Sequence, residues 1–295
     1  MIYGAIDGGG TGSRILIKNE KDKILFSNTG HSTNIYSVGK EKALENLLSL
    51  ISSYSHNIDS LCIGSAGLGR EKEILYFKEE IKKKYPNTKL YITNDIETLL
   101  VGAIDGLSGC ALISGTGSIA MARLDDGSTI RKGGFGWRLG DEGSAWYIAD
   151  QAVKRALKST ENRETKSLLP NKIVEFFNLK NISDIIPIWN NKDVTKEYLS
   201  SFSIEVYNLA KKGDLLSNNI MNDASQELFN LLNSLFIENK NLIHNPILLS
   251  GSILKKNEII RNKVISLIKE KNKDANIVIG SNKALEGALK IASII

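Results

Sequence analysis

Short apolar runs separated by polar turns alternate with amphipathic segments over the first third of the chain. Strands are expected at residues 2–6, 14–18 and 24–27, which are apolar and rich in β-formers. The glycine-rich segment 7–13 joins the first two strands and the polar segment 19–23 joins the next two, so the three should form a meander. The other elements expected here are a helix at 43–51, a strand at 61–63, a helix at 71–84, a strand at 90–93 and a helix at 96–104.

The same order of elements recurs after Gly106. Strand 110–113, the turn Ser114–Ser118 and strand 119–124 follow one another, and a hairpin turn at 125–127 precedes a weak strand at 129–131. This weak internal duplication suggests two related α/β halves, which we delimit as domains 1–106 and 107–295. The remaining expected elements are helices around 145–157, 165–178, 195–212, 216–239, 257–271 and 283–294, and strands at 247–249 and 277–279.

Composition and charge narrow the class of protein. The chain has 295 residues, and 38 basic against 33 acidic side chains give a net charge of +5 with no dense basic tract, so no nucleic-acid partner is expected. Cys62 and Cys110 lie in strand-like runs, no CxxC is present and only 3 His occur, which argues against a zinc site. No apolar run approaches the roughly 18 residues of a membrane span, and the first residues do not resemble a signal peptide. We expect a soluble protein of the reducing cytoplasm that binds no membrane.

The first glycine-rich turn, Asp7–Ser13, is a candidate phosphate site. It does not open a helix as a Rossmann loop would, and it lacks the GxxxxGK[ST] pattern of a P-loop. A glycine hairpin can still present backbone N–H groups to phosphate oxygens, and hydroxyls can add to them. The alternative is a plain tight hairpin that needs glycine for its backbone angles. The candidate residues are Gly9, Gly10, Thr11, Gly12 and Ser13, with Asp7 as a ligand of a metal ion through water.

The second turn supports the same hypothesis. Gly115, Thr116, Gly117 and Ser118 also follow an apolar strand, and two such turns could hold one polyphosphate. A third apolar strand ends in Gly251-Ser252, where a nucleotide base or ribose could approach the backbone. An ordinary strand-to-helix loop is the alternative for this third segment.

Asp95 is the candidate carboxylate for chemistry. The pair Asn94-Asp95 ends a strand and opens a helix, so Asp95 could serve as a helix N-cap. With the two phosphate turns in place, it would lie at the carboxyl edge of an α/β sheet, where ligands bind. A carboxylate in that place can orient a hydroxyl and accept its proton during phosphoryl transfer.

The order DGGGTGS, ND, SGTGS and LSGS resembles the sugar kinase/Hsp70/actin superfamily. The block Gly133–Ala145, GGFGWRLGDEGSA, closely resembles N-acetylglucosamine and N-acetylmuramic acid kinases of the BadF/BadG/BcrA/BcrD group, and the resemblance spans nearly the whole chain. It implies a two-domain α/β fold of the actin/hexokinase (ribonuclease H-like) type, with mixed five-stranded sheets flanked by helices and a cleft between the domains. The N-terminal domain would hold sugar and phosphate. The C-terminal domain, with a helical insertion, would hold the nucleotide.

The resemblance also implies roles for individual residues. Asp95 matches the base, Asp141 a ligand of sugar hydroxyls, and Asn34 a sugar-binding asparagine. Gly134, Phe135 and Gly136 match the segment that lines the sugar, and Ala210 matches a residue that borders the adenine. We add Arg138, the nearest basic residue to this block, as a partner for a lactyl carboxylate; the alternative is a structural or solvent-facing arginine.

The expected function is ATP- and Mg²⁺-dependent phosphorylation of the 6-hydroxyl of N-acetylglucosamine (GlcNAc) and N-acetylmuramic acid (MurNAc), in cell-wall sugar recycling, by a homodimer. Glucosamine kinase is one alternative. An activator of 2-hydroxyacyl-CoA dehydratases is another, although its cluster-binding cysteine is missing after the SGTGS turn. The cysteine-rich zinc motif of the ROK glucokinases is also absent. A non-catalytic sugar-binding regulator is the third alternative, and the presence of Asp95 argues against it.

Overall fold

The computed structural model describes residues 1–295, and their contacts divide the chain into two compact units. Residues 281–295, which a single boundary near Gly106 would assign to the second half, pack in the first unit. Unit 1 comprises residues 1–111, 122–129 and 281–295, and unit 2 comprises residues 112–121 and 130–280. No helix has both the length and the apolar character needed to cross a bilayer.

Unit 1 is built on a five-stranded mixed sheet with the order β3-β2-β1-β4-β5. The first three strands pair antiparallel, which confirms the predicted meander, and β4 and β5 extend the sheet in parallel with β1. The glycine hairpin closes between Gly8 and Ser13, which face each other in the register. The strands are β1 (Ile2–Gly8), β2 (Ser13–Asn19), β3 (Ile24–Gly30), β4 (Ser60–Ser65) and β5 (Lys89–Thr93).

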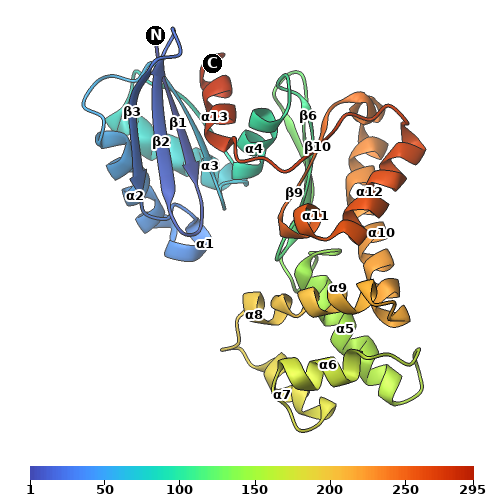
Figure 1. Cartoon of the computed structure of the whole chain (residues 1–295). Helices are drawn as coiled ribbons and strands as arrows, with labels where there is room; N and C mark the ends of the chain where they lie inside the picture. Colours follow the sequence, from blue (N-terminus) through green and yellow to red (C-terminus); the bar gives the residue numbers. More distant parts are fainter. The chain divides into compact units, whose positions relative to one another are not determined.

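Alternating side chains of this sheet form two apolar cores, because successive residues of a strand point to opposite faces. Ile6, Ile15 and Ile17 pack against α2 (Lys40–Ser52) and α3 (Glu71–Lys84). Ala5 and Cys62 pack on the other face, against α4 (Asp95–Ala103) and α13 (Ala284–Ala292). Figure 1 shows the sheet between these two layers, with the short helix α1 (Ile35–Val38) beside the hairpin.

The second sheet repeats the first. Its strand order is β10-β9-β6-β7-β8. Read in reverse, this is β8-β7-β6-β9-β10, so β6 to β10 occupy the same places in the second sheet as β1 to β5 occupy in the first. The predicted internal duplication is therefore confirmed, and so is the expected fold class of two mixed five-stranded sheets flanked by helices. Cys110 is buried in this sheet as Cys62 is in the first, as the sequence predicted. The strands are β6 (Gly109–Ser114), β7 (Ser118–Arg123), β8 (Thr129–Gly133), β9 (Ile247–Ser250) and β10 (Ile277–Ile279).

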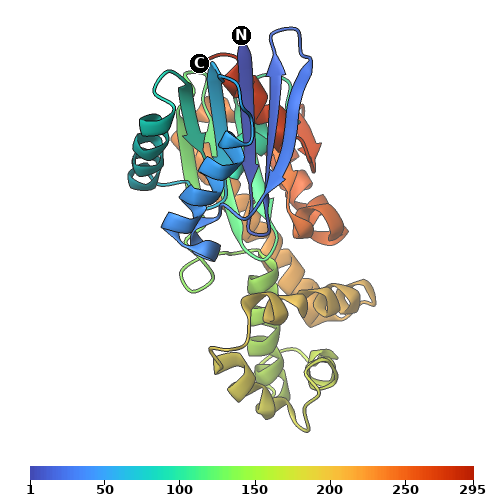
Figure 2. The ribbon, with the colours of Figure 1, turned by 90° about the vertical axis from the view of Figure 1, so that its left-hand side faces the viewer.

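The helices of unit 2 gather around α5 and α10. α6, α8 and α9 pack against α5, and α9 and α12 pack against α10 (Figure 2). The helix expected over 195–212 is divided at the buried Phe202, and the sequence did not predict α7, α11 or the two short 3-10 helices. The helices are α5 (Ala145–Thr160), α6 (Leu169–Phe176), α7 (Ile185–Asn190), α8 (Lys196–Ser201), α9 (Ser203–Lys211), α10 (Leu215–Glu238), α11 (Ser252–Lys256) and α12 (Glu258–Lys271), with 3-10 helices at Ile182–Asp184 and Lys240–His244.

Candidate active site

Asp95 lies at the carboxyl edge of the unit 1 sheet. Because β1, β4 and β5 run parallel, their ends bring Asp7 and Asp95 to the same edge. The helix α4 is capped by Asn94, whose side-chain oxygen accepts a hydrogen bond of 2.9 Å from the backbone N–H of Glu97. Asp95 is the first residue inside the helix, so its carboxylate is not the N-cap. The structure therefore excludes the alternative that Asp95 serves as the helix N-cap.

The environment of Asp95 favours a proton acceptor that works near neutral pH. Burial raises the pKa of its carboxyl from 3.8 to about 6; hydrogen bonds from the backbone at Asp95 and Ile96 oppose this rise, and the negative charge of Asp7 adds to it. A general base is most effective when its pKa lies close to the working pH. At pH 7 Asp95 is mostly ionised and still able to take up a proton.

The glycine hairpin is held in place from its base, and its tip is exposed. The backbone N–H of Gly9 donates to the carbonyl of Gly12 over 2.9 Å, and Ser32 Oγ donates to the carbonyl of Gly9, also over 2.9 Å. Ser13 is buried, and its hydroxyl donates to the His31 carbonyl over 2.8 Å. The hydroxyl of Ser13 thus serves the fold, whereas the tip at Gly10 and Thr11 is open to a ligand.

Two further unit 1 candidates already have partners. The carboxylate of Asp7 pairs with the Arg14 guanidinium over 2.6 Å. The side-chain oxygen of Asn34 accepts from the backbone N–H of Tyr36 over 2.9 Å and caps α1, so its amide nitrogen is the group left for a ligand. Asn34 lies beside Gly10 at the hairpin tip.

The second turn is held by Asp141. The backbone N–H of Ser118 donates to Asp141 Oδ1 over 3.1 Å, and Lys196 pairs with Asp141 Oδ2 over 2.7 Å. Asp141 is 4% exposed. Gly117 is required here, because an added Cβ would lie 2.8 Å from the Asp141 carboxylate. The structure thus shows Asp141 as the residue that ties the GDEGS segment to the SGTGS turn.

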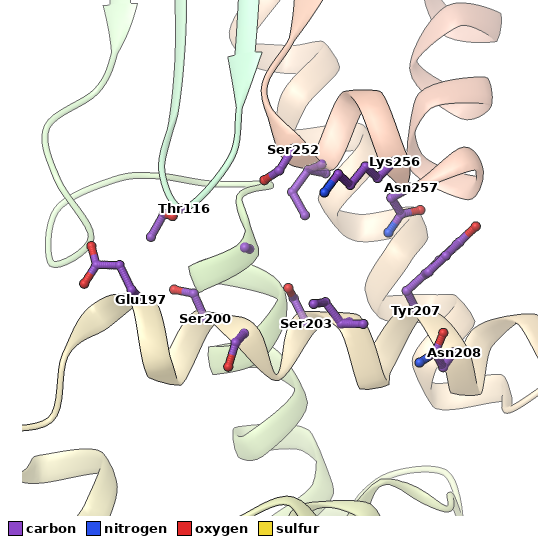
Figure 3. A pocket seen from close by; sticks show the side chains of 13 residues that line it. Thr116, Glu197, Ser200, Ser203, Tyr207, Asn208, Ser252, Lys256 and Asn257 are labelled. Carbon is purple, nitrogen blue, oxygen red and sulfur yellow. The ribbon is translucent and has the colours of Figure 1, made fainter. Parts of the chain in front are cut away.

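A cavity of about 370 Å³ opens beside this turn in unit 2 (Figure 3). Ser200 and Ser203 form one wall, while Ser252 and Lys256 face them from the start and end of α11. Gly251, at the N-cap of α11, has φ +90°, and an added Cβ would collide with the backbone of Ser114. The cavity is lined by Thr116, Ala145, Glu197, Ser200, Ser201, Ser203, Ile204, Tyr207, Asn208, Ser252, Ile253, Lys256 and Asn257.

Ala210 lies outside the residues that line this cavity. It is buried in α9, and its carbonyl accepts hydrogen bonds from the Asn218 side chain and from the backbone N–H of Gly213. Tyr207 and Asn208, one turn earlier on the same helix, line the cavity instead.

The aromatic loop that follows β8 is exposed. Phe135 is 71% exposed, so it is not an ordinary core residue. Gly134 and Gly136 have positive φ angles of 69° and 88°, which bend the loop on both sides of this ring. Arg138 forms no ion pair, and its guanidinium lies 4.8 Å from the centre of the Trp137 ring.

Comparison with known proteins identifies the family. The model of the BadF/BadG/BcrA/BcrD ATPase family matches residues 5–292. The chain belongs to this family. An N-acetylmuramic acid/N-acetylglucosamine kinase of Clostridium acetobutylicum is 35% identical over 231 residues, 76% of each chain. An N-acetyl-D-glucosamine kinase of Dictyostelium discoideum is 29% identical over 250 residues, 79% of this chain and 78% of the relative. A crystal structure from Chromobacterium violaceum that carries an N-acetylglucosamine kinase assignment superposes with a TM-score of 0.71 at 20% identity, over 99% of this chain and 98% of the other.

ATP is the nucleotide that the BadF/BadG/BcrA/BcrD ATPase family uses, and the cavity of unit 2 fits a polar ligand. Ser200 Oγ is buried on its wall without a hydrogen-bond partner. A buried polar atom of this kind is normally satisfied, so a ligand hydroxyl or ring nitrogen would complete it. Lys256 supplies a positive charge on the opposite wall, and Tyr207 supplies an aromatic face.

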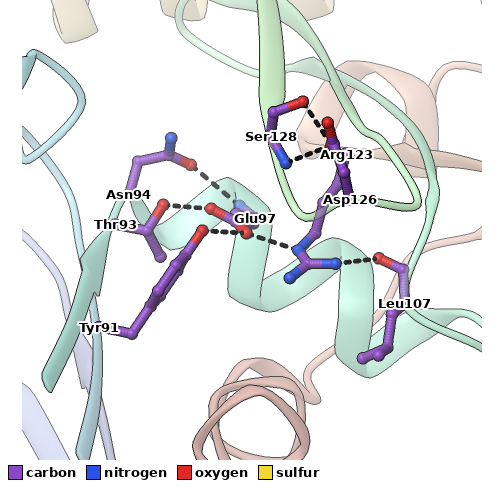
Figure 4. A network of polar contacts seen from close by, with 8 residues as sticks. All are labelled: Tyr91, Thr93, Asn94, Glu97, Leu107, Arg123, Asp126 and Ser128. Carbon is purple, nitrogen blue, oxygen red and sulfur yellow. Dashed lines mark hydrogen bonds and ion pairs between the residues drawn. The ribbon is translucent and has the colours of Figure 1, made fainter. Parts of the chain in front are cut away.

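The sequence did not predict the buried network around Glu97, which lies two residues after Asp95 in α4 (Figure 4). Glu97, 1% exposed, accepts hydrogen bonds from Tyr91 and Thr93 and pairs with Arg123 over 2.7 Å. Arg123 also donates to the carbonyl of Leu107 over 3.0 Å. A charged residue in the otherwise apolar run 96–104 was the signal that could have revealed it. The network fixes the first turn of α4, which carries Asp95.

Proposed function

We propose that this chain is a kinase that transfers the γ-phosphoryl group of ATP to the 6-hydroxyl of an N-acetylated amino sugar. GlcNAc is the principal substrate, and MurNAc is the second. The observation that carries the proposal is Asp95: it is a partly buried carboxylate at a sheet edge, it caps no helix, and its pKa is raised to about 6. The names of the relatives from Clostridium acetobutylicum and Dictyostelium discoideum support the choice of sugar.

In the proposed reaction the 6-hydroxyl oxygen forms a bond to the γ-phosphorus as the bond to the β-γ bridging oxygen breaks. Asp95 orients the hydroxyl and takes its proton, and the products are the sugar 6-phosphate and ADP. The backbone N–H groups of Gly10, Thr11 and Thr116 stabilise phosphate oxygens, because amide dipoles aimed at developing charge lower the barrier. The N–H of Gly115 already donates to the carbonyl of Gly117 over 2.9 Å and shapes the second turn. Arg14 pairs with Asp7 and orients its carboxylate at the end of β1.

Magnesium would be held mainly by the phosphates of ATP, with Asp7 as a ligand through water. The residues fit this indirect role, since the structure contains no group of three or more acidic, histidine or cysteine side chains that could hold a metal by themselves. The ion would neutralise phosphate charge. Asp7, with one oxygen on Arg14, keeps its other oxygen for water.

On the sugar side, we assign Asn34 and the segment from Gly134 to Gly136 to the pyranose. The amide of Asn34 can donate to a hydroxyl, and the exposed Phe135 ring can cover the apolar face of the sugar. Asp141, already engaged by Ser118 and Lys196, can accept from one further hydroxyl, because a carboxylate has about four lone-pair sites. We place the reaction in the recovery of cell-wall sugars in the cytoplasm, by a homodimer.

The test is a coupled assay of ADP release with GlcNAc, MurNAc, glucosamine, N-acetylmannosamine and glucose, with the phosphorylated position identified by ³¹P NMR. We expect turnover of the N-acetylated glucose derivatives above that of glucosamine and glucose. Release of ADP that no sugar stimulates would refute the proposal. An iron-dependent visible spectrum in anaerobically purified protein would favour the dehydratase activators instead.

A further inference from the structure

A second cavity in unit 2, of about 480 Å³, has a wall made of tryptophans. All 3 tryptophans of the chain line it, and they come from three separate segments. The rings of Trp137 and Trp146 meet edge to face at 4.8 Å, and those of Trp146 and Trp189 stack at 5.5 Å. We call this cavity the tryptophan pocket; it is lined by Trp137, Arg138, Trp146, Asp150, Trp189, Asn190, Asn191, Lys192, Val194, Lys196 and Leu199.

The charges of the tryptophan pocket favour an anion. Asp150 is paired with Lys154 over 2.6 Å and accepts a hydrogen bond from the Trp189 ring nitrogen, and Lys196 is paired with Asp141. Arg138 and Lys192 line the pocket and have no acidic partner. Two cations beside an aromatic wall suit a ligand that has both a carboxylate and an apolar part.

The tryptophan pocket adjoins the residues that we assign to the sugar. Trp137 and Arg138 follow Phe135 and Gly136 directly in the chain. On the other side, Lys196 lines the pocket and holds the carboxylate of Asp141. A sugar held by Phe135 and Asp141 would therefore lie next to this pocket.

We propose that the tryptophan pocket binds the carboxylate-bearing lactyl ether at C3 of MurNAc, with Arg138 and Lys192 on the carboxylate and the indole wall on the methyl group. This inference rests on the proposed function and adds the site that selects between its two sugars. GlcNAc has a hydroxyl at C3 and would leave the pocket unfilled. The size of the cavity leaves room for the added bulk.

Intrinsic fluorescence tests occupancy directly, because every tryptophan of the chain lines this pocket. We expect saturating MurNAc to change the emission of the wild-type protein, and GlcNAc to change it much less. In the coupled assay, Arg138→Gln and Lys192→Gln should each lower the ratio of kcat/KM for MurNAc to that for GlcNAc about 3- to 10-fold, the range for partly exposed charge contacts. The double variant should lower the ratio further, and Arg138→Lys should retain most of it.

Lys180→Gln is the matched control, since Lys180 is an exposed lysine of unit 2 that forms no ion pair and lies outside the tryptophan pocket. It removes the same charge and should leave the ratio of the two sugars unchanged. Equal effects of MurNAc and GlcNAc on fluorescence, or an unchanged ratio in the double variant, would overturn the inference while GlcNAc is still phosphorylated. A wild-type protein that phosphorylates neither sugar would instead refute the proposed function.

Discussion

The change Asp95→Asn separates the catalytic role of this residue from its structural role. Asparagine keeps the size of the side chain and removes the negative charge. The helix cap is supplied by Asn94 and stays intact. If Asp95 is the base, kcat should fall about 10²- to 10⁴-fold, the usual contribution of general base catalysis.

The same change should stabilise the protein at neutral pH. The pKa of Asp95 is raised in the folded state, so the folded protein binds the proton more tightly than the unfolded chain, and stability is lost as the pH rises from 3.8 to about 6. The difference between these values corresponds to at most about 3 kcal/mol. Because Asp95 retains some contact with solvent, we expect Asp95→Asn to raise the free energy of unfolding by about 1–2 kcal/mol above pH 7.

The measurement combines the coupled assay with urea denaturation at pH 8 and pH 4. At pH 8 the variant should show the lowered kcat and be more stable than the wild type. Near pH 4, where the wild-type carboxyl is largely protonated, the difference in stability should vanish. Asn94→Ala is the control: it removes the cap and should cost about 1 kcal/mol at both pH values.

Two results would refute the reasoning about Asp95. Turnover of Asp95→Asn close to that of the wild type would show that Asp95 is not the base. A loss of stability of the same size at pH 8 and pH 4 would show that the carboxylate makes structural contacts and is not penalised by burial.

Three other perturbations test the site. The kcat/KM of the wild type should decline below about pH 6 as Asp95 becomes protonated, and a pH–rate profile flat down to pH 4.5 would contradict this. Gly10→Val, at an open position, should weaken ATP binding in calorimetry without lowering the melting temperature. Gly117→Val should lower both the ATP affinity and the melting temperature, because its side chain would displace the buried Asp141 carboxylate. A Gly117→Val variant that melts at the same temperature as the wild type would show that this carboxylate is not needed to hold the turn. Arg123→Met leaves Glu97 buried without its cation and should lower the free energy of unfolding by about 3–5 kcal/mol in urea, and a loss under 1 kcal/mol would show that the pair is dispensable.

The sequence by itself determined the local elements and their repetition. Apolar runs rich in β-formers and separated by short polar or glycine turns predicted β1 to β3 and their meander, because strands joined by such short turns pair antiparallel with their neighbours. The spacing of apolar residues predicted α3 with the observed bounds, Glu71–Lys84. A charged amphipathic segment favours a helix with one buried face, and Pro86 cannot continue that helix. The repeated strand–glycine turn–strand order predicted the duplication, which both sheets confirm.

The tertiary structure alone decided which polar groups are already engaged. Asn94 and Asp95 are adjacent, and both suit a helix cap in sequence; the fold gives the cap to Asn94 and a partly buried position to Asp95. Asp141 is engaged by Lys196, which lies far along the chain, so no local pattern could reveal that contact.

Convergence of distant segments is likewise a property of the fold. The three tryptophans come from an exposed loop, from α5 and from α7, and only the packing of these elements makes them one wall. The same holds for α13, which packs on the sheet of unit 1. Its apolar face could pack against many surfaces, and contacts between segments far apart in the chain determine which surface it covers. Local patterns determine which face of an element is buried, and the three-dimensional arrangement of all the elements determines what buries it.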